Sequence, residues 1–156
     1  MKQQFFVVVD NVRSVENVGS IFRTADALSV DKVFLCGISP TPKHEKMAKT
    51  ALGAEKTVAW EYHKQTWRLV KELKRQGVFI VALEQVKNSV SLESASWRTK
   101  FPLALVLGHE IKGVSPSALR LADAIVEIPM LGQKESLNVA VAFGIAGYEV
   151  NKHRAV

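Results

Sequence analysis

The residues of this sequence that could do chemistry gather in three segments, at positions 11–30, 101–116 and 128–150. Each segment begins where a predicted strand ends, and open α/β sheets bind their ligands at the carboxyl ends of strands. The segments also carry more polar residues and glycines than folding alone requires. We therefore expect these segments to contribute a binding or catalytic site.

Several common site motifs are absent from the sequence. The segment "GHEIKG" lacks the Gly-Lys-Ser/Thr ending of a phosphate-binding P-loop, and there is no G-x-G-x-x-G dinucleotide fingerprint. His109-Glu110 lacks the second histidine of a zinc-binding helix, and the lone Cys36 excludes both a CxxC pair and an internal disulfide. The four histidines form no nucleophile–base–acid set, being scattered at positions 44, 63, 109 and 153. We expect no metal site.

The composition is that of a single globular domain. Of the 156 residues, 47% are hydrophobic and 23% are charged, so we expect one domain over residues 1–156. The sequence has no signal-peptide pattern and no run of about 20 apolar residues, and one cysteine fits a reducing compartment. These features predict a cytoplasmic protein that does not contact a membrane. The net charge of +6 is compatible with a polyanionic partner.

Short apolar runs alternate with helical patterns along the chain, which predicts an α/β fold with a mostly parallel sheet flanked by helices. Strands are expected at 5–9, 33–35, 58–62, 78–83, 103–108 and 124–128. Helices are expected at 17–28, 43–52, 65–76, 115–122 and 137–152, with an irregular connection at 85–100. Asn17 is expected to cap the first helix, because its side chain can accept hydrogen bonds from the free amides of the first turn.

The last predicted helix, from Leu137 to about Lys152, is apolar on nearly every side. Such a helix must be covered by protein on both sides. In a small domain, a terminal helix achieves this by packing on a second subunit. We therefore expect a homodimer; the alternative is a helix in the centre of one chain.

The ordered motifs of this chain resemble one family. The matching residues are Asn17, Gly19, Arg23-Thr24-Ala25, Leu107-Gly108, Glu110, Gly113, Ile128-Pro129-Met130, Gly132 and Ser136-Leu137-Asn138. Together with "KMAKTALGAEKTV" (46–58) and "VALE" (81–84), they resemble the SpoU (TrmH-like) branch of the SPOUT RNA methyltransferases. The resemblance covers nearly the whole chain.

This resemblance implies both an activity and a fold. Members transfer a methyl group from S-adenosylmethionine to a ribose 2′-hydroxyl of tRNA or rRNA, and they work as homodimers; for this chain tRNA is favoured. It also implies a Rossmann-like sheet with a C-terminal trefoil knot. One alternative is a non-catalytic RNA-binding protein on the same scaffold. A nicotinamide oxidoreductase is a third possibility, against which the missing glycine fingerprint counts.

The resemblance also implies which residues bind S-adenosylmethionine. Gly108, Ile128 and Leu137 are the expected direct contacts, with Leu83, Leu107, Met130 and Asn138 around them. Apolar side chains can wall the cofactor, and Gly108 and Gly132 would let the backbone approach it closely because glycine has no Cβ. The alternative is that Leu107, Ile128 and Leu137 are ordinary core residues.

By the same resemblance, Arg23 is the residue that activates the ribose hydroxyl. Because a guanidinium normally stays charged, Arg23 could instead fix the adjacent phosphate and stabilise a developing alkoxide, or form a surface salt bridge with Asp26. Four further polar positions match the family's motifs: Asn17, Glu110, Ser136 and Asn138. Asn17 and Ser136 could instead cap helices. Glu110 is expected to anchor the motif loops or to orient Arg23 of the partner subunit.

Two groups of basic residues are candidates for binding RNA phosphates. Lys43, Lys46 and Lys49, together with His44, begin in a loop after Pro42 and are the better candidates. The second group lies on one stripe of a predicted helix, at Lys64, Arg68, Lys71 and Arg75. A solvated helix face is the favoured interpretation of that stripe, because Glu72 lies beside it.

Overall fold

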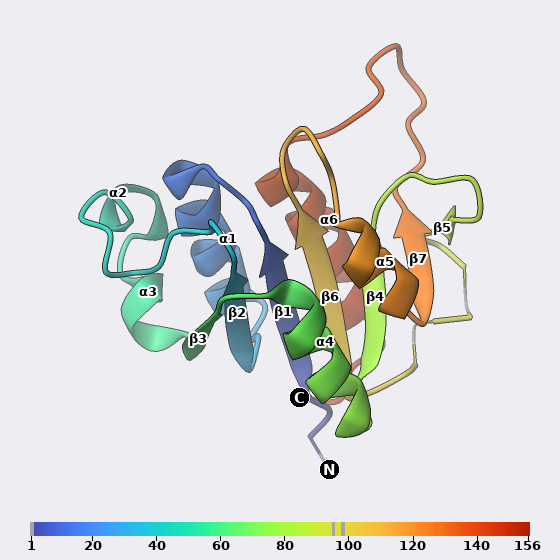
Figure 1. Ribbon diagram of the computed structural model, residues 1–156, viewed down its shortest axis with the longest axis horizontal. Coiled ribbons are helices and arrows are strands. Elements are labelled where there is room, and N and C mark those ends of the chain that lie inside the picture. The colour runs from blue at the N-terminus through green and yellow to red at the C-terminus, as the bar shows by residue number, and fades with distance from the viewer. Residues whose placement is uncertain (1, 95, 98) are drawn as a thin grey trace.

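A central sheet of seven strands runs through the part of the chain that the computed structural model describes, residues 2–94, 96–97 and 99–156 (Figure 1). The strands are β1 (Phe5–Asp10), β2 (Lys32–Cys36), β3 (Trp60–His63), β4 (Phe79–Leu83), β5 (Val90–Ser91), β6 (Leu103–Gly108) and β7 (Ala124–Glu127). Their order is β3-β2-β1-β6-β4-β7-β5, and each of these neighbouring pairs is parallel. The predicted parallel α/β fold is therefore confirmed. The trefoil knot implied by the resemblance stays a prediction.

The two central strands are apolar because both of their faces are covered. β1 reads FFVVVD and β6 reads LALVLG, and nearly all of their residues are buried. They pair in register, with Val7 opposite Leu105 and Asp10 opposite Gly108. Such continuous apolar runs are typical of parallel strands with helices on both sides. The chemistry of the molecule must therefore come from the loops at the strand ends.

Helices cover both faces of the sheet. α1 (Val15–Ala27), α2 (Ala48–Ala51), α3 (Ala54–Thr57) and α6 (Val139–Asn151) share one apolar core with the sheet. α4 (Thr66–Arg75) and α5 (Pro116–Leu121) share the other and lie in front of the sheet in Figure 1. α1 packs against α6, and α4 packs against α5. The parallel strands thus end at one common edge of the sheet. The first residues of several helices lie at the same edge.

The predicted caps of α1 and α6 are wrong. α1 begins at Val15, and Ser14 is its cap, because the Ser14 hydroxyl accepts a hydrogen bond from the Asn17 amide at 3.1 Å. Asn17 therefore lies inside the first turn, with its side chain free for other partners. α6 is capped by Asn138, whose Oδ1 accepts from the amides of Ala140 and Val141. Ser136 lies two residues before this cap and does not perform that role.

The predicted helix at 43–52 is also wrong, since only Ala48–Ala51 is α-helical. Before it, the His44 amide donates to the Thr41 carbonyl and the Met47 amide to the His44 carbonyl, which are three-residue turns. Leu52 then ends the helix with a φ of 52°. In the connection expected to be irregular, Val90–Ser91 forms the short strand β5. Two positions of that connection, 95 and 98, lie outside the described residues.

The last helix, α6, is covered on one side only within this chain. Phe143, Ala146 and Val150 are buried against the sheet. The opposite face exposes three apolar or aromatic side chains one turn apart, at Val141, Ile145 and Tyr148. Among the described residues, no helix has both the length and the hydropathy needed to cross a bilayer. The exposed face of α6 is therefore an apolar surface that this chain alone does not cover.

Arg154 ties the end of the chain to its beginning. Its side chain is fully buried and pairs with Asp31 at 2.8 Å. The guanidinium also donates to the backbone carbonyls of Gln3, Leu28 and Ser29. A buried charge held in this way is stable only while all of its partners remain.

We expect Arg154→Ala to lower the free energy of unfolding by about 1–3 kcal/mol, because the buried carbonyls of Gln3 and Ser29 lose their donor and Asp31 keeps only Lys2 as a cationic partner. Urea unfolding followed by circular dichroism measures this loss. The control is Arg120→Ala on the exposed side of α5, which should change stability by about 0.5 kcal/mol or less. Equal effects of the two substitutions would show that the buried pair does not stabilise the fold.

Candidate active site

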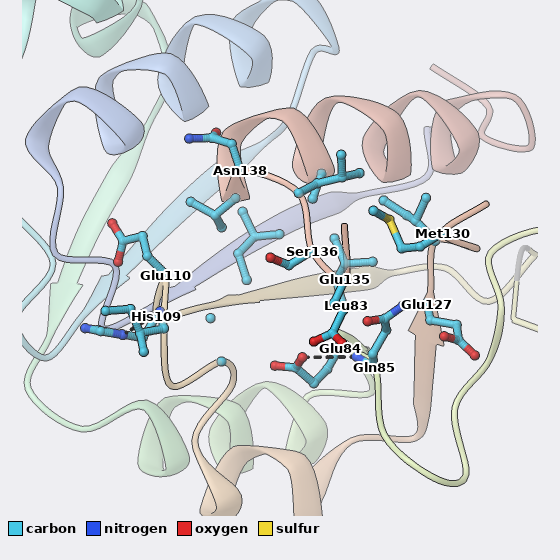
Figure 2. Close-up of a pocket in the computed structure, with 18 residues that line it drawn as sticks. Leu83, Glu84, Gln85, His109, Glu110, Glu127, Met130, Glu135, Ser136 and Asn138 are labelled. Carbon is cyan, nitrogen blue, oxygen red and sulfur yellow. Dashed lines mark hydrogen bonds between the residues drawn. The ribbon is translucent and has the colours of Figure 1, made fainter. Parts of the chain in front are cut away.

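A pocket of about 300 Å³ lies at the carboxyl ends of β4, β6 and β7, where the first residues of α6 close it (Figure 2). Its lining comes from segments 83–85, 107–113, 127–130 and 135–142. Figure 1 shows the loop between β7 and α6 projecting beyond the edge of the sheet. The carboxyl edge of a parallel sheet is where α/β proteins bind ligands. Two of the three segments singled out from the sequence meet in this pocket.

All of the residues expected around a cofactor line this one pocket. They are Leu83, Leu107, Gly108, Ile128, Met130, Leu137 and Asn138. Leu107 is 1% exposed and also belongs to the core, so its two interpretations do not exclude each other. Leu137 is 39% exposed and cannot be called a core residue. The structure therefore brings together side chains that the sequence separates by more than fifty positions.

Four carboxylates lie among the polar residues of the pocket lining. Glu84 is committed to structure, because its Oε2 accepts from the Val114 amide at 2.9 Å and its Oε1 from the Gln85 amide at 3.0 Å. Within the described residues, Glu127 and Glu135 make no side-chain hydrogen bond or ion pair. Two unpaired carboxylates beside an apolar wall favour a ligand that carries both apolar and positively charged parts.

The glycines at 108 and 113 are needed for the loop after β6 to close. A Cβ at Gly108 would overlap the backbone of Gly113 and Val114, so this glycine lets the 109–113 loop close on itself. Gly113 has a φ of 72°, and a Cβ there would overlap the carboxylate of Glu84. A Cβ at Gly132 would meet nothing within 4 Å. The expectation that Gly132 lets the backbone approach a cofactor closely stays a prediction.

Glu110 is the centre of a polar network at one end of the pocket. Its carboxylate accepts hydrogen bonds from the amides of Arg13 and Ser14 and from the Asn17 side chain, at 2.9–3.2 Å. Partial burial raises the pKa of Glu110, but the hydrogen bonds from Ser14, Arg13 and Asn17 outweigh it and leave the pKa below its ordinary value. The ionised form thus anchors the start of α1 to the loop after β6.

Asn17 extends this network to the third segment. Its Oδ1 accepts a hydrogen bond from the Asn138 side chain at 3.0 Å, and Asn138 in turn caps α6. The chain of contacts therefore runs from Glu110 through Asn17 to Asn138. Three of the five polar residues expected in the site are joined directly. The expectation that Glu110 anchors motif loops is consistent with these contacts.

The structure does not bring Arg23 to this network. Arg23 lies six residues after Asn17 on α1, about 9 Å along the helix axis, and it does not line the pocket. The alternative of a salt bridge with Asp26 is wrong, since Asp26 instead accepts from the Thr57 hydroxyl at 2.9 Å. Among the described residues, the exposed guanidinium of Arg23 has no partner. Ser136 lines the pocket and is exposed.

The basic residues expected to bind RNA are all on the surface. Lys43, Lys46 and Lys49 are exposed in the turns and short helix that follow β2. On the α4 stripe, Arg75 forms an ion pair with Glu72, and Arg68 lies over the ring of Trp67. The α4 stripe is thus partly occupied by its own contacts, as a solvated helix face should be.

Sequence reasoning missed the structural role of Glu84. This residue follows a buried strand directly, and its carboxylate holds the far end of the 109–113 loop. One feature of the sequence could have indicated this role. Glu84 is an acidic residue at the carboxyl end of an apolar strand, within the motif "VALE" (81–84). The contribution of Arg13 and Ser14 comes from their backbone amides, which no side-chain pattern reveals.

The fold and the pocket define an α/β protein with a ligand site at the carboxyl edge of a parallel sheet. The model of the SpoU rRNA Methylase family matches residues 4–148. The chain belongs to this family.

Similar proteins carry related names. The chain is 34% identical over 148 residues to tRNA (guanosine(18)-2′-O)-methyltransferase of Escherichia coli (strain K12), covering 95% of this chain and 63% of that protein. It is 36% identical over 154 residues to the enzyme of that name from Aquifex aeolicus (strain VF5), covering 98% and 71%. The crystal structure of AdoMet-bound rRNA methyltransferase from Sinorhizobium meliloti superposes with a TM-score of 0.89, at 29% identity, over 98% of this chain and 57% of that one. The chain thus spans less than two thirds of the Escherichia coli relative.

The anchoring role of Glu110 predicts a pH-dependent effect of Glu110→Gln. At pH 7 we expect the variant to unfold about 2–4 °C below the wild type, because a charged acceptor of three N–H groups is lost. The folded-state pKa of Glu110 is lowered, so its contribution is complete above the unfolded-state pKa near ~4.3 and is lost as the pH falls through the folded value. Thermal unfolding between pH 7 and pH 3 should therefore show the gap closing on acidification.

The matched control is Glu93→Gln, at an exposed position outside the pocket. It should leave the unfolding temperature unchanged across the same pH range. A Glu110→Gln gap that stays constant down to pH 3 would show that the ionised carboxylate is not the stabilising group.

Proposed function

We propose that this chain is an S-adenosylmethionine-dependent RNA methyltransferase that acts on a ribose 2′-hydroxyl. Family membership and the named activities of similar proteins support this assignment. The observation that carries it is the convergence of the seven expected cofactor residues on one pocket beside the Glu110–Asn17–Asn138 network. In this proposal residues 1–156 work as one methyltransferase domain.

The pocket suits S-adenosylmethionine on chemical grounds. The cofactor joins an adenine and a ribose to a positively charged sulfonium and an amino group. Leu83, Met130 and Leu137 would contact its apolar parts, and the unpaired carboxylates of Glu127 and Glu135 favour its positive charges. When bound, the cofactor supplies the methyl group for transfer. The acid-rich lining contrasts with the net positive charge of the chain.

The role of Arg23 in this proposal is electrostatic. The ribose hydroxyl must lose its proton as its oxygen bonds to the incoming methyl carbon, and negative charge develops on that oxygen. A guanidinium keeps its own proton at neutral pH, so Arg23 stabilises this charge rather than accepting the proton. Exposure and the lack of a partner within the described residues leave Arg23 free to do so.

A homodimer would complete the site. Arg23 does not line the pocket of its own chain, and it lies on α1, which packs beside α6. The exposed apolar face of α6, with Val141, Ile145 and Tyr148, is what a second copy would cover. In this arrangement the pocket receives Arg23 of the partner subunit. In this proposal the homodimer both covers the apolar face of α6 and supplies Arg23 to the pocket.

The RNA substrate we favour is tRNA. Two of the similar proteins are named for methylation of guanosine 18 in tRNA, whereas the superposed structure is named for rRNA. Lys43, Lys46 and Lys49 supply exposed positive charge in the turns and short helix after β2, which suits either RNA. The choice between the two RNA classes therefore rests on the names of relatives, and labelling of bulk RNA tests it.

Incubation with tritiated S-adenosylmethionine and bulk RNA should label tRNA, and nuclease digestion should release a 2′-O-methylnucleoside. Arg23→Ala should lower the transfer rate by about 100-fold or more while calorimetry shows unchanged cofactor binding, because charge stabilisation is lost and the pocket is intact. Arg120→Ala is the matched control. RNA binding without cofactor binding would instead support the non-catalytic alternative, and label on a base would contradict ribose methylation.

Ile145→Glu should convert a dimer into a monomer, because a charge placed on the exposed face of α6 cannot be buried in an interface. Light scattering coupled to size-exclusion chromatography measures the mass of each variant. Leu52→Glu, which alters an exposed apolar residue far along the chain from α6, should stay dimeric. A wild-type chain that is monomeric at micromolar concentration would rule out the dimer.

A further inference from the structure

Two carboxylates hold the far end of the loop after β6. The Val114 amide donates to Oε2 of Glu84 at 2.9 Å. The next amide along the chain, that of Ser115, donates to Oδ2 of Asp10 at 2.7 Å. Asp10 is the last residue of β1 and Glu84 follows β4 directly, and these are the two strands that pair with β6. The loop therefore leaves the sheet from the middle one of three strands and is bound again by the strands on both sides of it.

Both of these carboxylates belong to residues that the sheet holds in place. Asp10 is 1% exposed, and its Oδ1 accepts from the Thr66 hydroxyl and from the Asn11 side chain. The backbone amide of Glu84 donates to the Val126 carbonyl at 3.0 Å, which continues the pairing of β4 with β7. Groups supported by strands are held more precisely than groups on free loops. The two carboxylates are therefore fixed points to which the loop is attached.

The attached loop is one wall of the pocket. Residues 107–111 and 113 line the pocket, and Glu84 lines it as well, whereas Asp10 lies behind the wall. Figure 2 shows Glu84 and Gln85 on the side of the pocket opposite Asn138. The loop has no spare space against its anchor, because a Cβ at Gly113 would overlap the Glu84 carboxylate. Loss of either carboxylate therefore displaces a wall that faces the bound ligand.

We infer that Asp10 and Glu84 are positioning residues for the methyl donor, because together they hold the loop after β6 where it can bind S-adenosylmethionine. This inference rests on the proposed function of the pocket. The two anchored amides are consecutive, so removing either acceptor frees the same point of the backbone. The two residues should therefore have similar effects, although only Glu84 lines the pocket. They act through the loop, so they change the affinity for the whole nucleoside and not for one charge on it.

A direct charge contact is the competing explanation for Glu84, since its carboxylate could attract the sulfonium of the donor. The product of methyl transfer, S-adenosylhomocysteine, has the same adenosine and amino-acid parts but a sulfur without charge. A carboxylate that contacts the sulfonium would favour the donor over this product, whereas a displaced wall weakens the binding of both. The ratio of the two Kd values therefore distinguishes a positioning role from a direct contact.

Calorimetry of Glu84→Ala and Asp10→Ala with both nucleosides tests the inference. Each variant should raise the Kd of S-adenosylmethionine and that of S-adenosylhomocysteine by about tenfold, which leaves their ratio unchanged. Glu84→Asp keeps the charge but is one methylene shorter, so it should also weaken the binding of both nucleosides. The control for stability is Arg154→Ala, whose contact with the Gln3 carbonyl lies at the other end of β1. It should unfold more easily than the wild type yet keep both Kd values within about twofold.

Three results would overturn the positioning role while leaving the proposed function intact. These are unchanged Kd values in Glu84→Ala and Asp10→Ala, a loss in Glu84→Ala that is confined to S-adenosylmethionine, and an equal loss in Arg154→Ala. Where Asp10→Ala does not fold, Asp10→Asn replaces it, because it keeps the shape of the side chain and one acceptor oxygen. A wild-type chain that binds neither nucleoside would instead overturn the proposed function and this inference together.

Discussion

The carboxylate of Glu110 joins parts of the chain that lie almost a hundred residues apart. It fixes the start of α1 through the amides of Arg13 and Ser14, and Asn17 passes the connection on to Asn138 at the start of α6. Hydrogen bonds to a charged acceptor are the stronger kind, and a network loses more than one contact when its centre is removed. The loop after β6 and the starts of α1 and α6, which meet at one end of the pocket, are therefore held together by this carboxylate.

The parallel sheet determines which loops the Glu110 network can connect. Parallel pairing of β1, β6, β4 and β7 places their carboxyl ends at one edge, so loops far apart in sequence meet there. Because the strands themselves are buried on both faces, only these loops can carry polar groups to a ligand.

Long apolar patterns predicted the fold well, and short or competing signals did not. The strand at 103–108 and the helix that Ser115-Pro116 begins were both found from sequence, since each has a strong local signal. Ser14 and Asn17 are both good caps. In the structure Ser14 caps α1, and the side-chain amide of Asn17 donates to Glu110, a contact that depends on tertiary structure. The pocket lining followed from the family resemblance, whereas the contact between Glu84 and the Val114 amide depends on how two loops meet in the folded chain.

The strand order has a consequence for how the chain is made. Val7 pairs with Leu105, so β1 lacks one neighbour until β6 has been synthesised. β7 then adds beyond β4, and α6 covers the finished sheet last. Contacts between residues so distant in sequence slow folding, and an unpaired apolar strand edge invites association with other chains. A nascent chain that stops before residue 103 therefore holds the strands β1 to β5 without β6, which joins β1 to β4.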